Sequence, residues 1–101
     1  MAAYLLAEVS PGDIEGFRES GYLEAATRTA EAHGGAYLVR GGETTVLEGG
    51  WAPERLVVIR FPSMQDLRAW HNSAEYQEWV AVRRRYAPDS KLVAVEGYVP
   101  A

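Results

Sequence analysis

The segment RLVVIRFPSMQDLRAW, Arg55 to Trp70, joins a strand pattern to a helix pattern and decides the fold. Its first seven residues are rich in valine and isoleucine, which favour strands. Ser63 follows, with Asp66 three residues later, and this spacing is an acidic variant of the capping box that opens a helix. The segment therefore predicts a strand that leads directly into a helix.

The first half of the chain repeats this pattern at an offset of 53 residues. Pro11 suits the first position of the earlier helix, and Gly34-Gly35 suits its end. Chance similarity is the alternative explanation, because the matches are short. The aligned pairs are Ser10 with Ser63, Asp13 with Asp66, Ile14 with Leu67, Phe17 with Trp70, Ser20 with Ser73, Leu23 with Tyr76, and Tyr4 to Leu6 with Val57 to Ile59.

The elements follow the order β-α-β-β-α-β, with helices expected within residues 10–35 and 63–88. This order and the repeat predict one α+β domain, residues 1–101, with a ferredoxin-like four-stranded antiparallel sheet. The run from Glu43 to Gly49 is expected to continue the second strand after a bend. The four predicted strands are Ala3 to Val9, Ala36 to Arg40, Arg55 to Phe61 and Lys91 to Val99.

The last two predicted strands are largely apolar on both alternating faces. A sheet with helices on one face and water on the other is expected to have one polar face. A second copy of the same sheet would cover the remaining face, so the pattern predicts a homodimer. The alternative is a monomer with a mildly apolar open face.

Composition excludes several classes of function. The chain has no cysteine, which excludes disulfides, thiolate metal sites and cysteine nucleophiles. A net charge of −4 argues against nucleic acid as the main partner. The first residues have no basic segment and too short an apolar run for a signal peptide or membrane span, so we expect a cytoplasmic protein without a membrane partner. The basic run Arg83 to Arg85 is interpreted as a solvated helix end.

Several motifs together resemble the DUF1330 family, in the right order over nearly the whole chain. They are GGAYLVRGG (34–42), VLEG (46–49), RLVVIRFPS (55–63), SAEYQ (73–77) and VEGY (95–98). The resemblance implies membership of the dimeric α/β-barrel superfamily, in which two ferredoxin-like subunits join their sheets. Relatives there include cofactor-independent monooxygenases, muconolactone isomerases, polyketide cyclases and haem-dependent chlorite dismutases. The family itself implies no settled activity.

No strong catalytic, nucleotide or metal motif is present. The paired glycines of residues 34–42 are interpreted as a helix stop and a strand bend, because a phosphate cradle needs the order strand, loop, helix. His33 and His71 are the only histidines, and neither has a carboxylate at a useful ligand spacing. The chain is also short beside the haem-binding relatives, so we expect no metal and no cofactor.

Two arginines match positions of the family motifs and are the predicted ligand anchors. Arg40 corresponds to the arginine of VRGG, and Arg83 to the arginine that follows EYQ. A guanidinium holds a carboxylate or enolate in bidentate geometry. The alternative for Arg83 is a surface position. Three further charges interrupt predicted strands and are expected to be paired or to face the barrel interior: Glu8, Arg60 and Glu96.

The aromatic segment AWHNSAEYQEW, residues 69–79, supplies the remaining candidates. Trp70, Tyr76 and Trp79 are predicted to wall a pocket, with Trp70 as a core anchor because Phe17 is its repeat partner. Asn72-Ser73 is predicted to break the helix. His71 stands where the family often has tyrosine, and its imidazole can carry a proton near neutral pH.

Two hypotheses remain open. The first is a cofactor-independent enzyme for a small polar or anionic organic molecule, in which His71 moves a proton and Arg40 or Arg83 stabilises an oxyanion. The second is a ligand-binding or structural homodimer without catalysis, in which the aromatic residues belong to the core.

Overall fold

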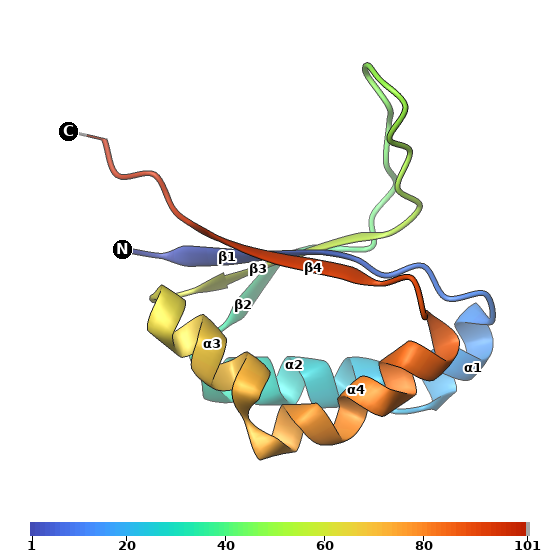
Figure 1. Cartoon of the computed structure of the whole chain (residues 1–101), viewed down its shortest axis with the longest axis horizontal. Helices are drawn as coiled ribbons and strands as arrows, with labels where there is room; N and C mark the ends of the chain where they lie inside the picture. Colours follow the sequence, from blue (N-terminus) through green and yellow to red (C-terminus); the bar gives the residue numbers. More distant parts are fainter. Residues whose placement is uncertain (101) are drawn as a thin grey trace.

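The computed structural model describes residues 1–100 and confirms the predicted α+β class. All strand pairs are antiparallel, and the sheet order is β2-β3-β1-β4, as in the ferredoxin-like arrangement. The elements are β1 (Ala3–Glu8), α1 (Ile14–Glu19), α2 (Tyr22–Ala32), β2 (Ala36–Arg40), β3 (Leu56–Phe61), α3 (Met64–Asn72), α4 (Ala74–Tyr86) and β4 (Lys91–Glu96) (Figure 1).

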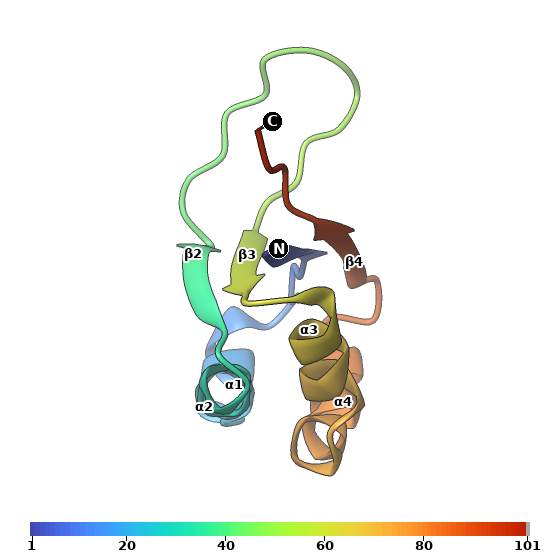
Figure 2. The ribbon, with the colours of Figure 1, turned by 90° about the vertical axis from the view of Figure 1, so that its left-hand side faces the viewer.

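The molecule has two layers, because all four helices lie on the same side of the sheet (Figures 1 and 2). The core lies between the layers and is largely aromatic. Its largest fully buried side chains are Trp70, Tyr76, Phe17, Phe61 and Ile59. Trp70 is therefore a core anchor, as its match with Phe17 predicted. No helix in residues 1–100 is both long enough and apolar enough to span a membrane.

The predicted repeat agrees with the structure at the junction between the two helices of each half, but not in the strands. Ser20 and Ser73 each follow the first helix of a pair, α1 or α3, as the offset of 53 requires. In the strands, however, buried Leu5 corresponds to buried Ile59, an offset of 54. The predicted match of Leu5 with Val58 was wrong, because a shift of one residue moves a side chain to the other face.

The caps of the helices explain where the chain turns. Ser63 accepts a hydrogen bond from the Asp66 amide at 3.1 Å, which confirms the predicted start of α3. Ser73 caps α4 in the same way, so the predicted break is also confirmed. The prediction of Ser10 as a cap was wrong. Asp13 caps α1 instead, since its carboxylate accepts from the Gly16 amide at 2.9 Å.

Residues 41–55 form an arm that stands off the sheet on the side away from the helices (Figure 1). The predicted strand from Glu43 to Gly49 is absent, because the arm has no neighbouring strand with which to pair. The bulge lies earlier, inside β2, between Tyr37 and Val39. The interpretation of the paired glycines is confirmed: Gly34 follows α2 and Gly41 follows β2, with φ of +82° and +72°.

Candidate functional site

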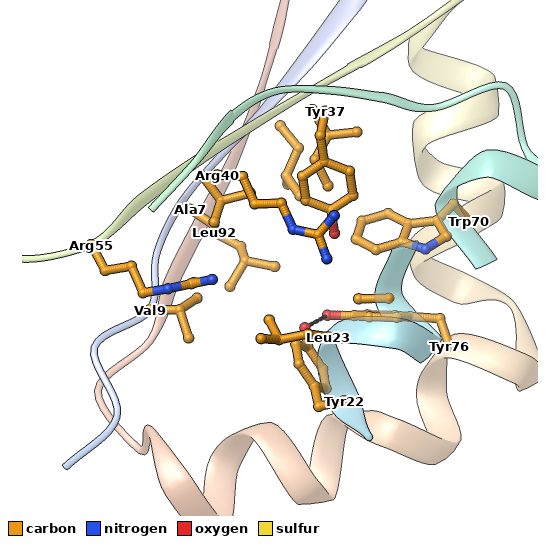
Figure 3. A pocket seen from close by; sticks show the side chains of 14 residues that line it. Ala7, Val9, Tyr22, Leu23, Tyr37, Arg40, Arg55, Trp70, Tyr76 and Leu92 are labelled. Atoms are coloured by element: carbon orange, nitrogen blue, oxygen red, sulfur yellow. Dashed lines mark hydrogen bonds between the residues drawn. The ribbon is translucent and has the colours of Figure 1, made fainter. Parts of the chain in front are cut away.

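A narrow cavity lies between the sheet and the helices. Its volume is about 30 Å³, counted as space open to the centre of a water molecule, which is room for about two waters. Small apolar and aliphatic side chains of the sheet and of α2 form much of the wall. The polar and large aromatic side chains that line it are Arg40, Arg55, Tyr22, Tyr37, Trp70 and Tyr76 (Figure 3).

Two cations reach toward the cavity from the sheet side (Figure 3). Arg40 ends β2, and its guanidinium carbon lies 4.8 Å from the centre of the Tyr37 ring. Arg55 precedes β3 and is half-buried. Burial lowers the pKa of Arg55, and the nearby charge of Arg40 acts in the same direction. An anion between the two guanidinium groups would relieve both effects.

Arg55 is a site residue that the sequence interpretation missed. Its position is two residues before Val57 and four before Ile59, which both face the helices. Strand alternation could therefore have placed Arg55 on the covered face. Gly41 makes room for it, because a Cβ on that glycine would lie 2.9 Å from Arg55 Nε.

The helix side of the cavity carries a chain of hydrogen bonds. Arg83 Nη1 donates to Tyr76 Oη at 2.6 Å, and Tyr76 Oη lies 2.7 Å from Tyr22 Oη. Tyr22 and Tyr76 line the cavity, whereas Arg83 lies behind Tyr76. Burial raises the pKa of both tyrosines, so both hydroxyls keep their protons at neutral pH.

The surface alternative for Arg83 is wrong. Arg83 is 6% exposed, because it belongs to a buried stripe of α4 together with Tyr76 and Val80. Arg84 and Arg85 are exposed, so the interpretation of this basic run as a solvated helix end is correct for these two residues and wrong for Arg83. Arg83 Nε has no hydrogen-bond partner within residues 1–100.

The arginines of the site lack acidic partners in the described chain. The ion pair found among residues 1–100 joins Lys91 Nζ to Glu8 at 4.0 Å and lies on the open face of the sheet. Among residues 1–100, none of Arg40, Arg55 or Arg83 has a carboxylate within the same distance. Arg83 is the buried one of the three, and a buried cation without a counter-ion is costly.

The predicted aromatic residues divide into two groups. Trp70 and Tyr76 stack on each other with ring centres 4.3 Å apart, and both line the cavity. Trp70 Nε1 donates to Thr29 Oγ1 at 3.0 Å, which satisfies its only polar atom. Trp79 is partly buried against the core and lies near Gly21, but it does not line the cavity.

His71 lies beside a different hollow. It lines a groove of about 180 Å³ between α3 and β4, together with Arg68 and Asn72. Leu5 and Leu92 border both this groove and the cavity. The ring centre of His71 is 5.8 Å from that of Tyr76. Burial lowers the pKa of His71, and the charge of Arg83 adds to this effect.

The open face of the sheet carries two of the three charges that interrupt the strands, Glu8 and Arg60, whereas Glu96 pairs with buried Ala3 and lies on the other face. Glu8 accepts a hydrogen bond from Trp51 Nε1 of the arm at 3.3 Å, so it is paired as expected. Arg60 is exposed on this face, and Glu96 is exposed on the edge strand β4, without an ion pair in the described chain. Beneath Trp51 lies an apolar hollow of about 520 Å³ bordered by Leu6, Leu56, Val58 and Val93.

The element order and the sheet topology place the chain in the class of ferredoxin-like α+β proteins, and solved structures agree. A protein of unknown function from Rhodopseudomonas palustris superposes with a TM-score of 0.75 at 17% identity, over 98% of this chain and 84% of its own. A dimeric ferredoxin-like protein of unknown function from Thermobifida fusca gives 0.63 at 16% identity, over 96% and 92%. SnoaB, a cofactor-independent oxygenase from Streptomyces nogalater, gives 0.63 at 12% identity, over 98% and 94%.

The family follows from the sequence itself. The model of DUF1330, a domain of unknown function, matches residues 2–98, so this chain belongs to the DUF1330 family and the resemblance of its motifs is confirmed. Among curated proteins, none matches the sequence significantly. Its structural neighbours include proteins of unknown function and oxygenases, and identities this low establish the fold alone.

Proposed function

We propose that this protein binds a small organic anion in the cavity between its sheet and its helices. The observation that supports the proposal is the uncompensated positive charge around the cavity. Arg40 and Arg55 line it, and Arg83 lies one hydrogen bond behind it. No carboxylate of residues 1–100 pairs with any of the three. A guanidinium binds a carboxylate through two parallel hydrogen bonds, which suits a ligand of this charge.

The dimensions of the cavity limit the ligand. A volume of about 30 Å³ admits only a molecule of a few heavy atoms without rearrangement. Arg40 is exposed and Arg55 is half-buried, so these two side chains can move aside more readily than the buried rings opposite them. A small carboxylate that enters between the two arginines fits the charge, and it fits the space once these side chains move aside.

A titration monitored by nuclear magnetic resonance tests this proposal. Small carboxylates are added to the full chain and to the Arg40→Ala variant, and the Trp70 indole signal reports on the cavity. Wild-type protein is expected to bind at least one carboxylate, and Arg40→Ala to bind it at least tenfold more weakly. Arg28→Ala, which removes an exposed arginine of α2, is the matched control and is expected to bind normally. Equal loss in both variants would contradict the proposal.

Cofactor-independent catalysis is the second candidate function. It is supported by the position of His71, whose ring lies 5.8 Å from Tyr76, and by the likeness of the fold to an oxygenase of that type. In this proposal His71 moves a proton, Arg40 or Arg83 stabilises an oxyanion, and Trp70, Tyr76 and Trp79 shape the surroundings. A His71→Ala variant that binds a ligand but no longer converts it would support catalysis. Equal conversion by both proteins would exclude this role of His71.

The partner that we propose is a second copy of the chain. On the open face Leu6, Val93 and Val95 are 42%, 62% and 49% exposed, and no helix covers them. The relative from Thermobifida fusca is described as dimeric. Face-to-face packing of two sheets would bury these side chains. Sedimentation equilibrium is expected to give twice the chain mass of 11.1 kDa, whereas a monomer at micromolar concentration would contradict the proposal.

A further inference from the structure

The chain of hydrogen bonds behind the cavity begins at a group that can only donate. Arg83 has no acceptor atom on its side chain and does not lose its proton in proteins. Its bond of 2.6 Å therefore fixes Tyr76 Oη as the acceptor. Since Arg83 is buried on α4 and Tyr76 is fully buried, water does not compete for this bond.

The second bond of the chain takes its direction from the first. An oxygen that already accepts from a cation is a weaker acceptor for another proton and a stronger donor of its own. We therefore assign Tyr76 as the donor to Tyr22 across the 2.7 Å contact between their hydroxyls. The proton of Tyr22 is then left without an assigned acceptor among residues 1–100, and Tyr22 lines the cavity.

Both hydroxyls of these hydrogen bonds stay protonated. Burial raises the pKa of Tyr22 and of Tyr76, although the charge of Arg83 opposes the shift in both. Neither hydroxyl therefore ionises at neutral pH to neutralise Arg83. Arg83 therefore keeps its charge behind the cavity, and with the assigned direction the O–H group of Tyr22 remains free to donate to a ligand.

We infer that Tyr22 is a hydrogen-bond donor positioned by Arg83 through Tyr76, and that the site selects small oxo-carboxylates. This inference rests on the proposed binding of an anion. Figure 3 shows the two polar sets on opposite sides of the cavity, with Arg40 and Arg55 toward the sheet and Tyr22 and Tyr76 toward the helices. The ligand carboxylate lies against the arginines, and its carbonyl oxygen accepts from Tyr22. A carbonyl suits this position better than a hydroxyl, because it presents no competing proton.

A matched pair of probes tests the inference. Pyruvate and propionate have the same carboxylate and a similar size, but only pyruvate has the carbonyl oxygen. Dissociation constants are measured by titration of the full chain, followed by nuclear magnetic resonance. Wild-type protein is expected to prefer pyruvate by about tenfold, the value of one good hydrogen bond. Tyr22→Phe is expected to abolish the preference, so that the dissociation constants of the two probes become equal.

Tyr76→Phe tests whether Arg83 positions Tyr22 through the two hydrogen bonds. This variant keeps the ring but breaks the link to Arg83, so it is expected to reduce the preference for pyruvate although Tyr22 is intact. A ratio of affinities is the readout, because a general loss of stability does not change it. Equal binding of both probes by the wild type would overturn this inference and leave anion binding standing. Binding of neither probe would overturn both.

Discussion

The two faces of the sheet differ in how far the helices of the chain cover them. On the covered face Leu5 and Ile59 are 4% and 1% exposed, whereas their neighbours Leu6 and Arg60 on the other face are exposed. The covered face borders the cavity that Arg40 and Arg55 line. The open face has exposed apolar side chains that none of the four helices covers (Figure 1). The comparison teaches that alternate residues of one strand meet different surroundings: one set packs against the helices around the cavity, and the other presents exposed apolar side chains.

The largest expected effect comes from the core of the covered face. Trp70→Ala removes a ring that is 1% exposed and stacks on Tyr76 and Phe61, so it is expected to lower the free energy of unfolding by about 3–5 kcal/mol. Urea unfolding followed by circular dichroism measures the change. Trp51→Ala on the arm is the matched control, because Trp51 is 64% exposed. In the monomeric protein this substitution is expected to lower the free energy of unfolding by less than about 0.5 kcal/mol. Equal losses of unfolding free energy in the two variants would show that the covered face contributes no more to stability than the arm does.

The open face is tested by a charge at its centre. Leu6→Glu is expected to weaken the proposed dimer by roughly 30- to 1,000-fold in dissociation constant, because association would bury an unpaired carboxylate. Sedimentation at several concentrations measures the effect. Leu47→Glu, on the arm and 89% exposed, is the control. A wild-type dimer that Leu6→Glu leaves intact would show that another surface carries the association.

A smaller effect is expected when one polar contact of the covered face is removed. Tyr76→Phe leaves Arg83 without its hydrogen-bond acceptor in a buried place, which is expected to cost about 1–3 kcal/mol of unfolding free energy. Tyr98→Phe removes the hydroxyl of a residue that is 87% exposed and should change stability little. Urea unfolding of both variants decides the matter, and an unchanged midpoint for Tyr76→Phe would mean that Arg83 finds other partners.

The smallest effect concerns the groove beside the covered face. The pKa of His71 is lowered in the folded protein, chiefly by burial and then by Arg83, so the unfolded chain takes up a proton first as the pH falls. Stability is therefore expected to be full above pH 6.5 and to decrease below it. Unfolding free energies measured between pH 7.5 and 5.5 reveal this slope, and His71→Gln should flatten it. An identical slope in the variant would assign the effect to other groups.

Local signals were predicted well because they depend on neighbours in the chain. Ser63 and Ser73 bond to amides three residues away, so spacing alone revealed both caps. Ser10 was misleading, because Asp13 occupies the cap position and can serve the same purpose. The strand offset was wrong by one residue, since both alternating sets of β3 are apolar and composition did not distinguish them.

The site was predicted only in part. Arg40, Trp70 and Tyr76 line the cavity, and Arg83 lies behind it, whereas Trp79 and His71 lie elsewhere. Whether any of them binds a ligand stays a prediction. Arg55 and Tyr22 were missed. Alternation along the strand could have revealed Arg55, but no local pattern pairs Tyr22 with a tyrosine 54 residues away.

The sequence by itself determined the order of the elements, the caps and break of the second helical segment, the aromatic core and the family. Hydrophobic periodicity and capping act over one or two turns, and a single chain records them completely. Only the tertiary structure decided that Arg83 is buried and that Tyr22 meets Tyr76 beside two arginines of the sheet. That outcome depends on how two pairs of helices pack on one face, where distant side chains compete for the same space and the same hydrogen bonds.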